Sequence, residues 1–184
     1  MISILFIIAL TFPVAVASTA FSINNNVQSA RDLQLGRKLF YAVVIALGQG
    51  VMYSLGALLG NTFMHTMASF SKWVVFALCF SISYRMFLDT LKIKKGANLF
   101  MTEKKLHLIL LSVALGVNAF IAGLMFDFLP LFQNLTPYII MAAAFVWAVA
   151  FILIPFSKMK LTLNSLLNVI FSAIIVLIGI AHVF

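Results

Sequence analysis

The sequence predicts an all-α, polytopic membrane protein, a bundle of six transmembrane helices, on three observations. Hydrophobic residues make up 64% of the 184 residues and charged residues only 9%, and the mean hydropathy is +1.17. Six apolar runs are long enough to supply the roughly 20 residues that a helix needs to cross a bilayer. The runs are continuous, unlike the alternating strands of a membrane barrel. Helices are required because lipid leaves backbone groups no partner outside their own segment.

The six runs account for most of the chain. They cover residues 2–23, 38–60, 68–91, 106–127, 136–156 and 162–183. The first run has the small residues of a signal-peptide cleavage site at Ala15, Ala17 and Ser18. It lacks a basic segment before the apolar stretch, so we expect it to remain as the first helix. Little chain lies between the runs, so we expect one domain, residues 1–184, without a separate catalytic module.

Lysines and arginines gather in the first, third and fifth connections, whereas the fourth connection and both termini have none. By the positive-inside rule these basic connections face the cytoplasm, and both termini lie outside it. We therefore expect a multi-pass protein of the bacterial inner membrane. The net charge of +8 reflects this topology. A nucleic-acid partner would need the charges on one soluble face, so none is expected.

Six spans with both ends outside can be divided into two halves of inverted topology. The first repeat would be residues 1–91 and the second 106–184, joined by a basic cytoplasmic loop at 92–105. A faint internal similarity supports the division, because FPVAVAS in the first run aligns with VNAFIAG in the fourth. Inverted repeats commonly enclose a substrate site at the bilayer midplane.

Small residues mark the faces along which helices can pack closely. In the second run they recur every fourth position, at Ala42, Ala46, Gly50 and Ser54. The fourth run has Gly116 and Gly123. This pattern predicts that the second and fourth helices lie inside the bundle, and that Gln49 and Asn118 lie there with them.

Several short motifs resemble those of the putative manganese efflux pump family (MntP), which are small six-helix inner-membrane proteins. The matching segments are TFPVAVAS (11–18), KWVVFAL (72–78), YRMFLD (84–89) and GVNAFIAG (116–123). The first and last resemble the family signatures S-x-D-A-x-A-x-S and S-x-D-A-x-A-x-G. In the second run Gln49, followed by Gly56 and Gly60, takes the place of a family glutamate. The resemblance covers roughly residues 1–130 and implies a manganese exporter.

Three acidic positions of the family pattern are neutral in this chain. Pro13 and Asn118 stand where the signatures have aspartate, and Gln49 stands where the family has glutamate. A divalent cation stripped of water needs hard oxygen ligands, and its affinity rises with the number of charged ones. The departures therefore argue against Mn²⁺ export by the family's route. Neutral amides and carbonyls would hold a monovalent ion or a polar solute more easily.

The candidate substrate path runs between the first, second, fourth and fifth runs. We expect it to be lined by Pro13, Ser18, Gln49 and Asn118. Pro13 removes a backbone donor and frees the carbonyl of Ala9, which could coordinate an ion if the first helix is broken there. Structural roles compete with this hypothesis. The two amides could bond to each other or to backbone, and Pro13 could simply bend the helix.

Arg85 and Asp89 lie four residues apart, and therefore on one face of the third helix near its cytoplasmic end. An ion pair at the membrane interface is the simplest interpretation. A part in an inner gate is the functional alternative, because an ionisable group inside a span requires a partner.

The outer face holds the weak candidates for a metal site, namely Asp127, His65 and His182. Met64 and Met67 lie near His65 and could add soft ligands at an exit vestibule. The spacing matches no metal template, so ordinary interface residues are the simpler interpretation.

The sequence contains no nucleophile–base pair, phosphate-binding loop or Cys/His cluster, and its single cysteine, Cys79, lies within the third run. We therefore expect a transporter working by alternating access, not an enzyme, with no cofactor and Mn²⁺ at most as the transported ion. The alternative is a transport-inactive subunit or scaffold of a larger membrane complex, because such a history would explain the loss of three acidic residues. The lipid bilayer is the expected partner, and a homo-oligomer or larger membrane complex stays open.

Overall fold

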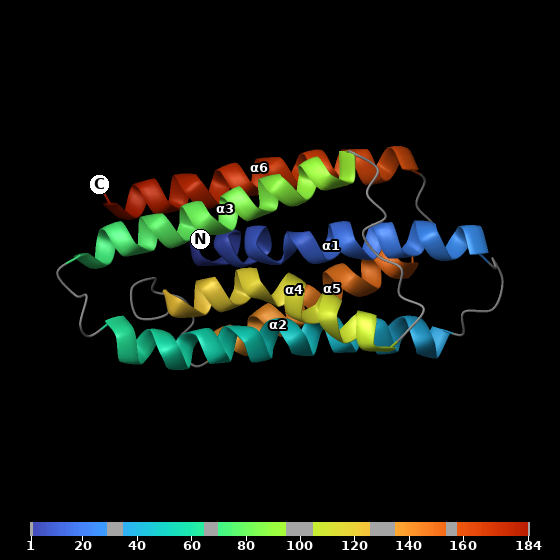
Figure 1. Cartoon of the computed structure of the whole chain (residues 1–184), viewed down its shortest axis with the longest axis horizontal. Helices are drawn as coiled ribbons and strands as arrows, with labels where there is room; N and C mark the ends of the chain where they lie inside the picture. The colour runs from blue at the N-terminus through green and yellow to red at the C-terminus, as the bar shows by residue number, and fades with distance from the viewer. Residues whose placement is uncertain are drawn as a thin grey trace.

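The residues that the computed structural model describes form six helices, one for each predicted run (Figure 1). They are α1 (Ile2–Gln28), α2 (Leu35–Met64), α3 (Ser71–Lys94), α4 (Lys105–Leu124), α5 (Thr136–Leu153) and α6 (Lys158–Val183). The described residues are 2–28, 35–64, 70–94, 105–125, 135–153 and 158–183, and they include no strand. The predicted all-α membrane bundle is thereby confirmed.

Four helices are long and apolar enough to cross a membrane. Their candidate spans are Ile2–Ala20, Lys38–Thr62, Ser71–Leu91 and Leu161–Val183. α4 and α5 contribute the shorter apolar stretches Leu108–Leu124 and Thr136–Ile152. Many large apolar side chains, such as Leu58 and Leu177, lie on the outside of the bundle. An apolar surface of this kind is suited to contact with lipid tails, because they offer no hydrogen-bond partners to polar groups.

α1 is the central helix of the bundle. It packs mainly against α5 and α6 and touches α4, and 72% of its span is buried, against 39% or less in the other three. Phe12 anchors it to both neighbours, with its ring centroid 5.4 Å from that of Trp147 on α5 and 4.5 Å from that of Phe171 on α6. Trp147, which lies deep in the fifth span, therefore fills the space between α1 and α5.

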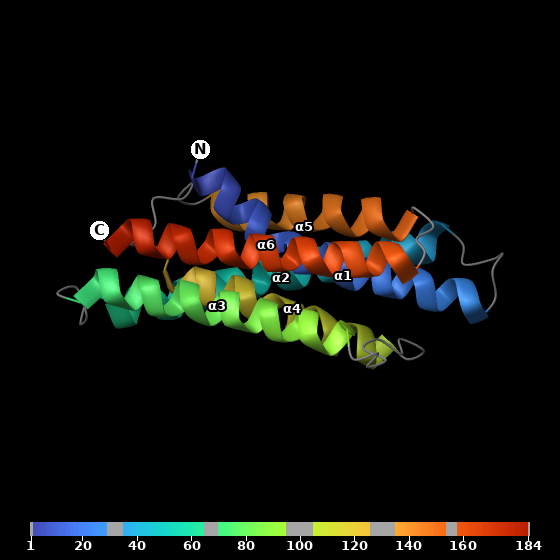
Figure 2. The ribbon, with the colours of Figure 1, turned by 90° about the horizontal axis from the view of Figure 1, so that it is seen from above.

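Successive helices run in opposite directions along the bundle, as expected of consecutive membrane spans (Figure 1). Both termini lie at the same end of the bundle (Figure 1). α1 continues through Pro13 without interruption, so the expected break of the first helix at this residue is wrong. Figure 2 shows instead that the start of α1 is inclined to the rest of the helix. A bend of this kind is the usual consequence of a missing backbone donor.

α2 and α4 form the most extensive helix pair in the bundle, and their glycines lie at the contact. Gly56 lies against the backbone of Phe120, and Gly123 lies against the backbone of Tyr53 and Ala57. A Cβ atom at either glycine would overlap these backbone atoms. Close approach through glycine is the usual way in which membrane helices gain packing energy, because lipid supplies no hydrophobic driving force between them.

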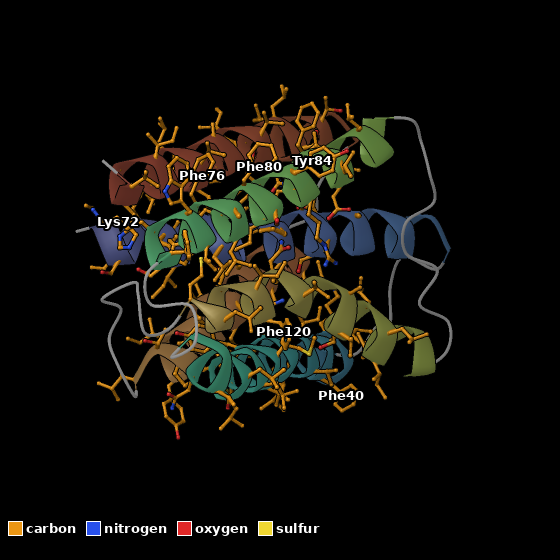
Figure 3. All side chains as sticks on the ribbon, turned by 60° about the vertical axis from the view of Figure 1, so that its left-hand side comes forward. Phe40, Lys72, Phe76, Phe80, Tyr84 and Phe120 are labelled. Carbon is orange, nitrogen blue, oxygen red and sulfur yellow. The ribbon has the colours of Figure 1, made fainter. Side chains whose placement is uncertain are left out.

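The outer face of α3 carries a row of aromatic side chains. Phe76, Phe80 and Tyr84 follow one another at a spacing of four residues, and successive ring centroids lie 6.4 Å apart (Figure 3). Phe80 and Tyr84 are exposed on the bundle surface. Trp73, close to the start of α3, is also exposed, and tryptophans are often found at membrane interfaces.

Candidate functional site

Gln49 and Asn118 both lie inside the bundle. Gln49 is at the middle of α2 and 1% exposed, and Asn118 is in the C-terminal half of α4 and 3% exposed. Their neighbours in the core include Tyr53, Ala119 and Ala122, which pack with α1. The two helices, which pack against each other, therefore keep both amides away from the bundle surface.

The two amides do not form the bond expected if they only held the bundle together. Nε2 of Gln49 and Oδ1 of Asn118 are buried, and each lacks a hydrogen-bond partner among the described residues. A donor and an acceptor left unpaired in this way each cost about 1–3 kcal/mol of desolvation. A buried polar atom without a protein partner requires an explanation, such as a bound water, an ion or a ligand.

The register of α2 against α4 explains why the amides do not meet. The facing pairs are Gly48 with Ser112, Met52 with Gly116, and Gly56 with Phe120. By this register Asn118 is level with Ser54, five residues beyond Gln49. At 1.5 Å per residue, the two amides are offset by about 7 Å along the helices.

α1 contributes two further groups on the predicted path. Pro13 is buried within the helix, so the carbonyl of Ala9 has no intrahelical donor from it. Ser18 is 1% exposed, and its hydroxyl has no hydrogen-bond partner within the described chain. All four predicted path residues are thus buried, and three of them carry a polar side-chain atom without a partner.

Arg85 lies close to the middle of α3 and reaches α4. Its Nη2 donates a hydrogen bond to the backbone carbonyl of Ala114, which is at the middle of α4 and one turn from Asn118. Asp89 is half-buried on the same helix. The predicted pairing of Arg85 with Asp89 stays a prediction. This exposed contact joins α3 to α4 near the middle of both helices.

The weak metal candidates at the outer face are not brought together by the part of the chain that is described. Asp127 and His65 lie outside the described residues, as does Met67. His182 is half-buried in the last turn of α6. Among the described residues, no three His, Cys, Asp or Glu side chains form a group able to hold a metal ion.

A buried polar seam between α3 and α6 was missed by reasoning from the sequence. Ser83 Oγ donates to the carbonyl of Ser172 at 2.8 Å, and Asn168 Nδ2 donates to the carbonyl of Met86 at 3.0 Å. Asn164 Nδ2 extends the seam to α1 by donating to Thr19 Oγ1 at 2.9 Å. The available signal was the four-residue spacing of Asn164, Asn168 and Ser172, which places three polar side chains on one helix face.

The fold and the site define a class of protein. A bundle of apolar helices surrounds a central bent helix, and uncharged polar groups without partners lie at mid-span in its interior. This combination is typical of small multi-pass membrane transporters.

Comparison with known proteins identifies the family. The family model described as "Putative manganese efflux pump" (Mntp) matches residues 32–183, and the chain belongs to this family. The match extends through α5 and α6, where the motifs had shown little resemblance, and begins after α1. The "Putative manganese efflux pump MntP" of Methanobrevibacter smithii is 26% identical over 168 residues, covering 91% of this chain and 90% of that protein. No solved structure matches the chain.

Proposed function

We propose that this chain exports a small cation from the cytoplasm by alternating access, along a path beside α1. The observation that carries the proposal is the pair of buried amide atoms without partners among the described residues, Gln49 Nε2 and Asn118 Oδ1, on α2 and α4, which pack against each other. Buried polar groups normally find partners. A hydrated solute that passes between these helices would supply the partners intermittently.

The packing of the helices supports a mechanism based on two inverted halves. The main packed pairs are α2 with α4, α1 with α5, α3 with α6, α2 with α5, and α1 with α6. Exchanging α1 with α4, α2 with α5 and α3 with α6 turns each pair into another pair that is also in contact, because α3 touches α4. This symmetry is expected if residues 1–91 and 106–184 are repeats of inverted topology.

The chemistry of the path favours weak binding of the transported ion. Amide and hydroxyl oxygens are hard ligands that suit Mn²⁺, but they carry no charge, and affinity follows the number of charged ligands. The family and the relative from Methanobrevibacter smithii are described as manganese efflux pumps, so Mn²⁺ is the first ion to test. Weak binding is compatible with transport, because an ion that binds tightly leaves slowly.

The orientation in the membrane follows from charge. The basic connections would face the cytoplasm, and both termini would lie on the opposite side. In this orientation the path leads from the end of the bundle that is rich in lysine toward the end that carries the two termini.

The decisive experiment is Mn²⁺ flux into proteoliposomes that contain a Mn²⁺-sensitive dye. We expect slow but measurable flux with the native chain. Asn118→Asp should increase the apparent Mn²⁺ affinity by about tenfold, since one added carboxylate contributes on the order of 1–2 kcal/mol to a partly buried cation. Asn61→Asp is the matched control, because Asn61 is exposed near the outer end of α2.

The competing function, a transport-inactive subunit of a larger complex, predicts a different pattern. Neither the native chain nor the Asn118→Asp and Gln49→Glu variants would then bind or move Mn²⁺ or a monovalent cation. A partner protein would instead co-purify in fixed proportion after mild detergent extraction. That combination of results would overturn the transport proposal.

A further inference from the structure

Asn118 lies on the face of α4 that contacts α3. Side-chain contacts with α3 flank it on both sides along α4: Arg85 Nη2 donates to the carbonyl of Ala114, and Cys79 Sγ lies 3.8 Å from Met125 Sδ. At 3.6 residues per turn, positions 114, 118 and 125 lie within about 40° of one another around the helix axis. α3 therefore runs past Asn118, although it packs mainly against α6 and only lightly against α4.

Arg85 and the backbone of Asn118 share one carbonyl oxygen. In an α-helix the carbonyl of Ala114 accepts the backbone N–H of Asn118, four residues later. The same carbonyl accepts a hydrogen bond from Nη2 of Arg85. Two donor nitrogens on one oxygen lie within about 6 Å of each other, because each is about 3 Å from it. The guanidinium is therefore next to Asn118, and not merely level with it on a neighbouring helix.

The side chain of Asn118 leans toward the turn that Arg85 contacts. Helical side chains are tilted toward the N-terminus of their own helix, so each covers the turn before its Cα atom. For Asn118 this turn begins at Ala114. The carboxamide and the guanidinium therefore lie over the same turn of α4.

The two side chains are chemically complementary. Oδ1 of Asn118 is buried, can only accept, and has no hydrogen-bond partner among the described residues. The half-buried guanidinium of Arg85 carries five N–H donors in a rigid fork, so it can serve a second acceptor while it keeps its bond to Ala114. A bond between the two groups reduces the cost of holding both at mid-span.

We propose that Arg85 binds Asn118 Oδ1 when the path is empty, as a cation tethered to the protein that a transported cation has to displace. The contact forms by rotation of the two side chains. A guanidinium and a metal ion do not share one amide oxygen, because like charges repel strongly at this distance in a medium of low dielectric constant. Arg85 thereby sets the cation concentration at which the path opens. This competition rests on the proposed function, whereas the contact itself does not.

Thermal unfolding of the purified full-length chain in detergent tests the contact. Asn118→Asp turns the acceptor into a carboxylate, which Arg85 should stabilise. When Arg85→Met is added, the unfolding midpoint should fall by about 5 °C more than the sum of the two single changes, since hydrogen bonds to charged groups are the strong class. Asn61→Asp is the matched control, because Asn61 is exposed near the end of α2 and its effect should simply add. Additive effects at positions 85 and 118 would overturn the proposal.

Asp89 is the competing partner of the guanidinium, because it lies one turn from Arg85 on the same helix. The same cycle with Asp89→Asn separates the two partners. Coupling of Arg85→Met to Asp89→Asn, with none to Asn118→Asp, would assign the guanidinium to Asp89 and overturn the proposal. Arg85→Lys keeps the charge without the fork, so it should retain part of the coupling to Asn118→Asp. It also replaces Arg85→Met in the cycle if that variant does not fold.

Mn²⁺ flux in proteoliposomes tests the competition. Removal of the tethered cation by Arg85→Met should lower the apparent KM for Mn²⁺ by about tenfold, which corresponds to the loss of one charged hydrogen bond. General damage to the fold would reduce the maximal flux without lowering KM. Lys72→Met removes an exposed charge near the start of α3 and should leave KM unchanged. An apparent KM of Arg85→Met equal to that of the native chain, or above it, would overturn the proposal.

These outcomes separate the contact from the proposed transport. Coupling between positions 85 and 118 in a protein that moves no cation would support the contact and overturn the transport, together with the competition that rests on it. Mn²⁺ flux from a protein without this coupling would overturn the contact alone.

Discussion

Replacing Gly123 with alanine tests the contact between α2 and α4, on which the placement of Gln49 and Asn118 depends. The new Cβ would overlap the carbonyl oxygen of Tyr53 and lie 2.8 Å from the amide nitrogen of Ala57. It would also lie 3.0 Å from the Cα atom of Gly56. These are backbone atoms, so no rotamer change can make room and the two helices must separate.

The expected cost follows from two opposing terms. Overpacking that forces backbone movement costs about 1–3 kcal/mol. Alanine is a better helix former than glycine by up to about 1 kcal/mol, which offsets part of the cost. We expect a net loss of about 1–2 kcal/mol. For a chain of this size, the unfolding midpoint should fall by about 2–4 °C for each kcal/mol.

Gly36→Ala is the matched control for this measurement. A Cβ at Gly36 meets nothing within 4 Å, so this variant gains helix propensity without any overlap. Both variants are compared with the native chain by thermal unfolding in the same detergent. If Gly123→Ala unfolds at the same temperature as Gly36→Ala or above it, the close approach of α2 and α4 is not present in solution.

Three further predictions concern single contacts. Pro13→Ala should raise the unfolding midpoint, because it restores a backbone hydrogen bond in α1. If the bend serves gating, the same variant should also slow cation flux. An unchanged unfolding midpoint would contradict the first effect. Arg85→Met should destabilise the chain by about 1 kcal/mol through loss of its bond to α4, with only partial rescue by Arg85→Lys; full stability of Arg85→Met would show that the bond contributes nothing. Asn164→Leu should cost about 0.6 kcal/mol, the average of interhelical hydrogen bonds in membranes, in the same unfolding assay; an unchanged midpoint would show that the bond to Thr19 contributes nothing.

The helices could be predicted because lipid imposes a strong and local rule. Each run of about 20 apolar residues has to be a helix, and the structure has a helix at every one. The burial of Gln49 and Asn118 could be predicted from the small residues around them, but the prediction that the whole second helix lies inside the bundle was wrong, because only 39% of its span is buried. The break expected at Pro13 was not found, because a helix that is buried among neighbours can continue through a proline with a bend.

The positions of polar side chains could be predicted only in part. Mid-span amides were recognisable in α2 and α4, but sequence cannot tell whether two amides are level. That depends on the α2–α4 register, which the glycine contacts determine. Asn164 and Asn168 were overlooked because no sequence motif in α6 indicates a role for them. Their importance appears only when α1 and α3 are seen beside them.

The most direct test of the proposed path is the accessibility of its two amide positions to water. Cysteines are introduced by Asn118→Cys and Gln49→Cys in a Cys79→Ala background and exposed to a membrane-impermeant thiol reagent from either side. Asn61→Cys, near the outer end of α2, is the positive control, and Leu110→Cys, on the apolar surface of α4, is the lipid-facing control. Reaction at both amide positions, with each position reached from at least one side, is the predicted result. If both are as unreactive as Leu110→Cys, no aqueous path passes Gln49 and Asn118.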